Sequence, residues 1–124
     1  VYTHIVSDGK RARRVLDEIH SPNLKIILDP VNLLHPDNLA RRGAVIDEAI
    51  ELLGDDVAIV HLKDYHATAT ALPACACGTG EMDYDAVLRF VSARKPHIQM
   101  TLEDTVPDNA EAARLFIERR AQEV

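Results

Sequence analysis

Three short apolar runs in this chain each lead into a side chain that can bind a divalent metal. They are 24–28 before Asp29, 57–60 before His61 and 98–102 before Glu103. Carboxylate and imidazole groups together suit Mn, Mg, Co, Fe or Zn acting as a Lewis acid. Cysteine is absent from the set, which argues against a structural zinc site. The pattern therefore indicates a catalytic site for a divalent metal ion, with Asp29, His61 and Glu103 as metal ligands.

The elements that must position these side chains alternate regularly. Apolar runs of this length are typical of buried strands, and each is followed by a helical pattern. Strands are expected at 1–6, 24–29, 57–63 and 98–103, each with a helix after it. This order predicts a parallel sheet with right-handed crossovers and helices on its faces. Parallel strands end at one edge, so the three side chains are expected to meet there.

Cap residues and helical spacing set the expected helices. Ser7, Asp8 and Gly9 break the first strand and offer a cap for the first helix. Gly54 offers a stop for the second helix, Asp83 a cap for the third, and Asp108 with Glu111 a capping box for the fourth. The segment 64–82 is expected to be a long loop in which Gly78 and Gly80 shape a turn. Each helix is expected to bury one apolar face. These faces are Ala12, Val15, Leu16 and Ile19 in the first helix; Val45, Ile46, Ala49, Ile50 and Leu53 in the second; Tyr84, Val87, Leu88 and Val91 in the third; and Ala112, Ala113, Phe116 and Ile117 in the fourth.

The alternation of side chains along the strands favours a barrel over a sheet covered on both faces. In the last strand, Met100 and Leu102 share one face, while Thr101 and Glu103 share the other, more polar face. A doubly covered sheet is apolar on both faces, whereas a barrel carries apolar residues outward and a mixed lumen inside. A complete barrel has eight β/α units and about 250 residues. The predicted fold class is therefore α/β, with four β/α units of a (β/α)8 TIM barrel in one partial domain, 1–124.

Composition narrows the class of protein further. The chain has 124 residues and a net charge of −6, which argues against nucleic-acid binding because such proteins usually carry a basic patch. Its apolar runs are too short to span a membrane. Cys75 and Cys77 are separated by one residue, which makes a disulfide between them awkward, so two free thiols and a reducing, cytoplasmic location are expected.

Four short motifs, in order, resemble one known family. They are Leu28-Asp29-Pro30-Val31-Asn32, His61-Leu62-Lys63-Asp64, Gly78-Thr79-Gly80-Glu81-Met82-Asp83 and Leu102-Glu103-Asp104. They look like the C-terminal half of the xylose-isomerase-like barrels, the sugar phosphate isomerase/epimerase proteins, which include ketose 3-epimerases, hydroxypyruvate isomerase and inosose dehydratase. The resemblance covers nearly the whole chain and implies the C-terminal half of a TIM barrel.

The resemblance also implies roles for individual residues. In the family, Glu, Asp, His and Glu hold one metal ion, and Asp29, His61 and Glu103 match the last three. The first Glu is expected just upstream of Val1. Proton transfer beside a carbonyl, through a metal-stabilised cis-enediolate, would use Glu103 as both ligand and acid/base.

Three further residues are predicted to contact the substrate. Asn32 stands where the family's ketose epimerases carry a substrate-binding His, which weakens the case for a free ketose substrate. Lys63 shares the parity of His61 and is expected either to contact a substrate oxygen or phosphate or to pair with Asp64 at the strand end. His4 is expected to line the site from the first strand.

Three functional readings follow from the sequence. The leading one is a metal-dependent isomerase or epimerase of a small sugar, sugar phosphate or polyol, with no nucleic-acid or membrane partner. The second is a metal-dependent hydrolase resembling endonuclease IV, which would need more ligands and a basic surface. The third is an inactive half-barrel. Because a half-barrel exposes two sheet edges, self-association into a homo-oligomer is also predicted.

Overall fold

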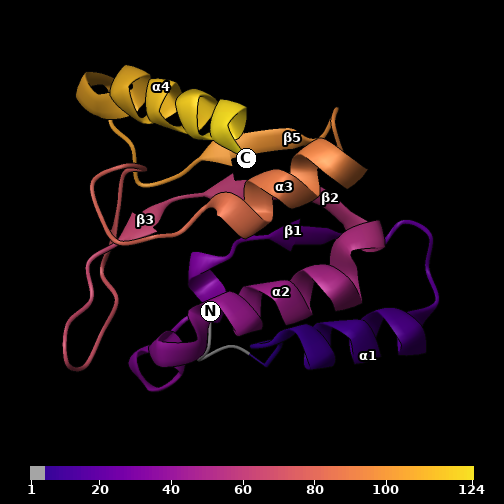
Figure 1. The fold of residues 1–124 in the computed structure, drawn as a ribbon. Helices are drawn as coiled ribbons and strands as arrows, with labels where there is room; N and C mark the ends of the chain where they lie inside the picture. Colours follow the sequence, from indigo (N-terminus) through magenta and orange to yellow (C-terminus); the bar gives the residue numbers. More distant parts are fainter. Residues whose placement is uncertain (1–4) are drawn as a thin grey trace.

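The candidate ligands are carried by a parallel sheet. The computed structural model describes residues 5–124. In it, β1 (Ile26–Leu28), β2 (Val57–Leu62) and β5 (Gln99–Leu102) form a parallel sheet in the order β1-β2-β5 (Figure 1). These three predicted strands are confirmed. Most of the strand expected at 1–6 lies outside the described residues, and Ile5 and Val6, which are described, lie in a bend.

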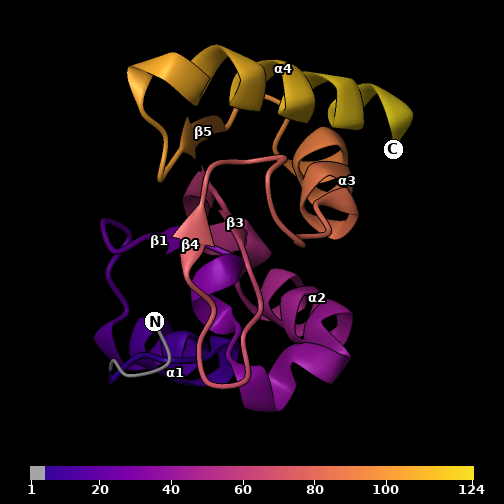
Figure 2. The ribbon, with the colours of Figure 1, turned by 90° about the vertical axis from the view of Figure 1, so that its left-hand side faces the viewer.

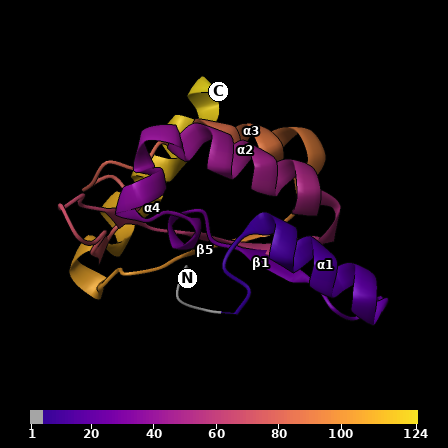
Figure 3. The ribbon, with the colours of Figure 1, turned by 90° about the horizontal axis from the view of Figure 1, so that it is seen from below.

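Four helices connect and follow the strands, as the alternation predicts. They are α1 (Gly9–Ile19), α2 (Arg42–Leu53), α3 (Asp85–Arg94) and α4 (Pro107–Glu123). The cap predicted for α1 within 7–9 is confirmed and is Asp8, whose carboxylate accepts a hydrogen bond from the Arg11 backbone N–H at 2.8 Å. Seen from below, α2 and α3 lie over one side of the sheet (Figure 3).

The strand faces differ as the parity argument predicts in β1 and β2, but not in β5, where Met100, expected on the apolar face, is 39% exposed. Leu28, Val60 and Leu62 are buried in a core with side chains of all four helices. On the opposite face, Ile27 is 54% exposed and Gln99 is exposed. The described residues therefore form an α/β structure whose parallel sheet is covered by helices on one face. The remaining core side chains are Ala12, Leu16, Val31, Leu34, Ile46, Ala49, Leu53, Val57, Tyr65, Cys77, Met82, Tyr84, Val87, Leu88, Phe90, Val91, Ala113 and Ile117.

The segment expected to be a long loop contains a small hairpin. Strands β3 (Asp64–Tyr65) and β4 (Ala74–Cys75) pair in antiparallel register (Figure 2). Two residues per strand are too few to show an alternating pattern in the sequence. The segment after β1 forms the short 3-10 helices η1 (Val31–Leu33) and η2 (Pro36–Arg41), and a third, η3 (Gly54–Asp56), follows α2.

The capping box expected at Asp108 and Glu111 is wrong. Helix α4 begins two residues earlier, at Pro107 with Val106 as its cap, and the Asn109 side chain accepts the Val106 backbone N–H at 2.8 Å. Proline favours the first helical position because its fixed φ suits the helix and its missing N–H has no helical partner there. This start leaves Ala112 exposed.

The other inner faces match the prediction in most positions. Ala113 and Ile117 are buried and Phe116 is half-buried. All four residues expected on the inner face of α3 are buried, and Phe90, which was not expected there, is buried with them. In α1, Ile19 is 57% exposed because the helix ends there, with His20 in the left-handed conformation.

Two strands of the sheet have an unpaired side among residues 5–124. Within this range, β1 and β5 each pair only with β2. Self-association through such edges stays a prediction. In the described part of the chain, no helix is long and apolar enough to cross a membrane.

Candidate metal centre

The sheet register brings the three predicted ligands together. Asp29 follows β1, His61 lies near the end of β2, and Glu103 follows β5. Leu28 pairs with Val60, and the Glu103 backbone N–H donates to the carbonyl of the β2 residue after His61 at 2.9 Å. One donor atom from each of the three side chains lies within 4.8 Å of the other two. Among residues 5–124, this is the one group of three or more metal-ligating side chains.

Hydrogen bonds and ion pairs fix the two carboxylates. His61 Nδ1 lies 2.7 Å from Glu103 Oε1. Lys63 Nζ lies 2.8 Å from Asp29 Oδ2 and 2.9 Å from Glu103 Oε2. Asn32 donates to Asp29 twice, from its side-chain amide at 2.7 Å and from its backbone N–H at 3.2 Å. The two carboxylates therefore converge on one cation, the Lys63 ammonium.

The surroundings shift the pKa of each charged group. Burial raises the pKa of Asp29, against the effect of its hydrogen bond with Lys63. The hydrogen bond from Lys63 lowers the pKa of the more exposed Glu103. Burial opposes the charge on Lys63, but its bonds to both carboxylates together outweigh this and raise its pKa. Two carboxylates against one ammonium leave the centre with an excess of negative charge, which favours a further cation.

The sequence matches a family model over most of its length. The model describes a xylose isomerase-like TIM barrel, and it matches residues 2–120. The chain belongs to this family. A curated relative, the 3-oxo-isoapionate decarboxylase of Pectobacterium atrosepticum, is 31% identical over 107 residues. The match covers 79% of this chain but 36% of that protein, so the chain spans about a third of its relative's length. No solved structure matches significantly.

The residues of this xylose isomerase-like chain fit a divalent metal ion. A carboxylate, an imidazole and a second carboxylate form a donor set that many catalytic divalent ions use. Ligand atoms about 2.0–2.2 Å from one ion are at most roughly 4.4 Å apart, close to the bound of 4.8 Å found here. The position between the carboxylates also already attracts a positive charge. Asp29, His61 and Glu103 would hold the ion.

The predicted substrate-contacting residues meet different outcomes. Lys63 faces the centre, and its ammonium pairs with Asp29 and Glu103, so the alternative that it pairs with Asp64 is wrong. Asn32 holds Asp29 in place and lines a neighbouring cavity. His4 lies outside the described residues.

Asp64 has a structural role that the sequence did not predict. Its side chain is buried and accepts backbone N–H groups from Tyr65 at 2.9 Å, Gly78 at 3.0 Å and Met82 at 2.8 Å. The role expected for the glycines is supported, because Gly78 has a φ of +83° and a Cβ on Gly80 would lie 2.2 Å from the Tyr65 carbonyl oxygen. Asp64 thus fixes the loop that follows the hairpin and lies beside the centre.

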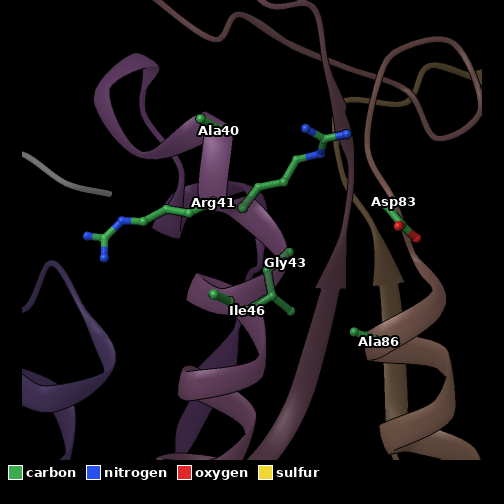
Figure 4. Close-up of a pocket in the computed structure, with 8 residues that line it drawn as sticks. Ala40, Arg41, Gly43, Ile46, Asp83 and Ala86 are labelled. Atoms are coloured by element: carbon green, nitrogen blue, oxygen red, sulfur yellow. The ribbon is translucent and has the colours of Figure 1, made fainter.

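Three cavities differ in their relation to the centre. A cavity of about 120 Å³ adjoins it, between the η1–η2 segment and the hairpin, and includes Lys63 and Asn32 in its lining. A larger cavity of about 360 Å³ lies between the N-terminal ends of α2 and α3, with Gly43 and Ile46 on one side and Ala86 on the other (Figure 4). None of its lining residues belongs to the metal centre. Besides the smaller cavity, a cavity of about 160 Å³ lined by Asp29 and Asn32 also adjoins the centre, so we assign the chemistry to these two rather than to the larger cavity.

Proposed function

We propose that this chain carries the metal centre of an enzyme that acts on a small sugar derivative through an enediolate. The observation that carries the proposal is the meeting of Asp29, His61 and Glu103 at the ends of neighbouring parallel strands. Chemistry in TIM-barrel enzymes is placed at this end of the strands. We also propose that the chain is part of a (β/α)8 barrel, of which it supplies the C-terminal units.

The residues suggest a division of labour. A divalent ion at the centre would stabilise negative charge on the oxygens of the substrate. Glu103, whose pKa is lowered by Lys63, is ionised at neutral pH and is the group that accepts a proton from the carbon beside the carbonyl. Asn32 fixes Asp29 by two hydrogen bonds and so orients this ligand.

Two reaction classes share this chemistry and differ in the bond that breaks. An isomerase or epimerase breaks a C–H bond beside the carbonyl and passes the proton to a base. An isomerase then returns a proton to the neighbouring carbon, and an epimerase returns one to the opposite face of the same carbon. A decarboxylase of a 3-oxo acid breaks a C–C bond, releases carbon dioxide and then takes up a proton. The second class is favoured by the name of the relative described above, a 3-oxo-isoapionate decarboxylase. Both leave an electron pair beside a carbonyl that a cation must stabilise.

The test compares the two reactions on the whole barrel, in which this chain is joined to the units proposed to precede it, before and after removal of divalent ions with a chelator. Proton NMR in deuterium oxide follows isomerisation and deuterium incorporation for a panel of ketoses, sugar phosphates and polyols. Release of carbon dioxide is measured for a panel of hydroxylated 3-oxo acids. We expect one of the two activities, lost on chelation and restored by Mn²⁺. Activity that survives chelation would refute the metal-dependent mechanism.

Matched variants separate the centre from the rest of the surface. His61→Ala and Glu103→Gln are expected to lower the activity at least a hundredfold, within the range typical of general acid–base groups. His97→Ala and Glu111→Gln change exposed residues of the same types and are expected to keep the wild-type activity. Equal activity in His61→Ala and His97→Ala would exclude His61 from the reaction.

A further inference from the structure

Lys63 occupies the place in the centre where positive charge is needed most. Its ammonium contacts one oxygen of Asp29 and one oxygen of Glu103, at 2.8 Å and 2.9 Å. These carboxylates are two of the three side chains that could hold a metal ion. The Lys63 side chain is 10% exposed and that of Asp29 is 8% exposed, so little water reaches the pair to replace either partner.

We propose that Lys63 is an exchangeable cation of this centre. A divalent ion displaces its ammonium from Asp29 and Glu103, and the ammonium then binds an anionic group of the substrate in the adjoining cavity. The inference rests on the metal-dependent function proposed above. It assigns to Lys63 a role in both metal affinity and substrate choice.

Charge and space both support the exchange. The ammonium and the ion would compete for the same two carboxylates, and like charges a few ångströms apart repel strongly in a partly buried site. A dication together with the ammonium carries three positive charges against two negative ones. The loaded centre would therefore attract an anion, whereas the centre without the ion repels one.

The adjoining cavity can receive such a group. Lys63 lines it together with Asn32, Leu34, Leu72 and Ala74. Its volume of about 120 Å³ is several times the roughly 10–15 Å³ that a cavity needs to hold one water, which is enough for a carboxylate or a phosphate. The flexible four-carbon stem of lysine lets the ammonium move between the carboxylates and this space.

The first experiment measures Mn²⁺ binding to the full chain, from the electron paramagnetic resonance signal of the free ion. Lys63→Met is expected to bind Mn²⁺ at least tenfold more tightly than the wild type, because the competing charge is gone. Lys63→Gln, which is also uncharged, is expected to shift the affinity in the same direction. The control is Lys25→Met, since Lys25 lies outside the centre, pairs with Asp56 at 3.7 Å and is expected to leave the affinity unchanged.

The outcomes separate this inference from the function on which it rests. If the wild type binds Mn²⁺ and Lys63→Met binds it equally or more weakly, the exchange is overturned, but the metal centre is still supported. Absence of binding in both proteins overturns both. Thermal unfolding checks the fold of each variant, and Lys63→Met without metal is expected to melt at a lower temperature that Mn²⁺ restores.

The second experiment tests the anionic group of the substrate. Calorimetry compares glycerate with uncharged glycerol as probes on the Mn²⁺-loaded proteins. The wild type is expected to bind glycerate at least tenfold more tightly than glycerol, and Lys63→Met to lose this preference. A preference that persists in Lys63→Met would show that the carboxylate is held without Lys63, which overturns this part of the proposal.

Discussion

Replacing Asp64 by alanine should destabilise the fold more than any surface substitution. Its carboxylate accepts three backbone N–H groups, those of Tyr65, Gly78 and Met82. The bonds from Tyr65 and Met82 are buried, so those two N–H groups would lose their partner without gaining water. At about 1.5–2 kcal/mol for each buried donor, the expected loss is about 3–4 kcal/mol. This is a large part of the roughly 5–15 kcal/mol that stabilises a domain.

Asparagine at the same position gives a finer test. It keeps one oxygen for Tyr65 and Met82 but places an amide N–H₂ against the N–H of Gly78, so a loss of about 1–2 kcal/mol is expected. Urea unfolding followed by far-UV circular dichroism measures both variants. Asp47→Ala, at an exposed position in α2, is the control and should stay within about 0.5 kcal/mol. A loss below about 1 kcal/mol in Asp64→Ala, with an unchanged slope, would refute this reasoning.

Three further changes test other parts of the structure. Gly80→Ala should cost about 1–3 kcal/mol by overpacking, while Gly43→Ala, where a Cβ meets nothing within 4 Å, should be neutral or stabilising; equal unfolding midpoints would contradict this. Leu62→Ala should cost about 2–5 kcal/mol in urea unfolding because Leu62 is buried at the centre of the sheet, and a loss below 1 kcal/mol would show that the core is loosely packed there. Burial raises the pKa of Cys77, so iodoacetamide should label the more accessible Cys75 first. Mass spectrometry of digested peptides measures this order, and labelling of Cys77 first would contradict the reasoning.

Much of the fold was predictable because the strands that carry the ligands are apolar runs, each followed by a helical pattern. Each of these runs forms a strand, and the helices between them begin and end close to the expected residues. The hairpin at 64–75 was missed because its strands are stabilised by a fixed loop rather than by a pattern of their own. The N–H groups that fix this loop bind Asp64 from as far along the chain as Met82, a separation at which sequence periodicity carries no information.

The start of α4 shows a second limit of the sequence. Asp108 and Glu111 have the three-residue spacing of a capping box. Val106 and Asn109 have the same spacing, and the structure forms one hydrogen bond between them, from the Val106 backbone N–H to the Asn109 side chain. Proline at 107 decides between them, because it suits the first turn of a helix and cannot donate inside one. Weighing the proline above the acidic residues would have placed the helix correctly.

Lys63 shows why the site could be located from the sequence but not completed. Strand parity placed Lys63 on the face of His61, and this is correct. Parity says nothing about which carboxylate on a neighbouring strand lies opposite, because that depends on register. The Glu103 backbone N–H donates to the Leu62 carbonyl, and this bond sets β5 so that the Glu103 carboxylate reaches Lys63. The nearest acid in sequence, Asp64, points to the other face because it is the next residue along the chain. A lysine beside an aspartate in sequence is therefore weak evidence for an ion pair between them when both lie at the end of a strand.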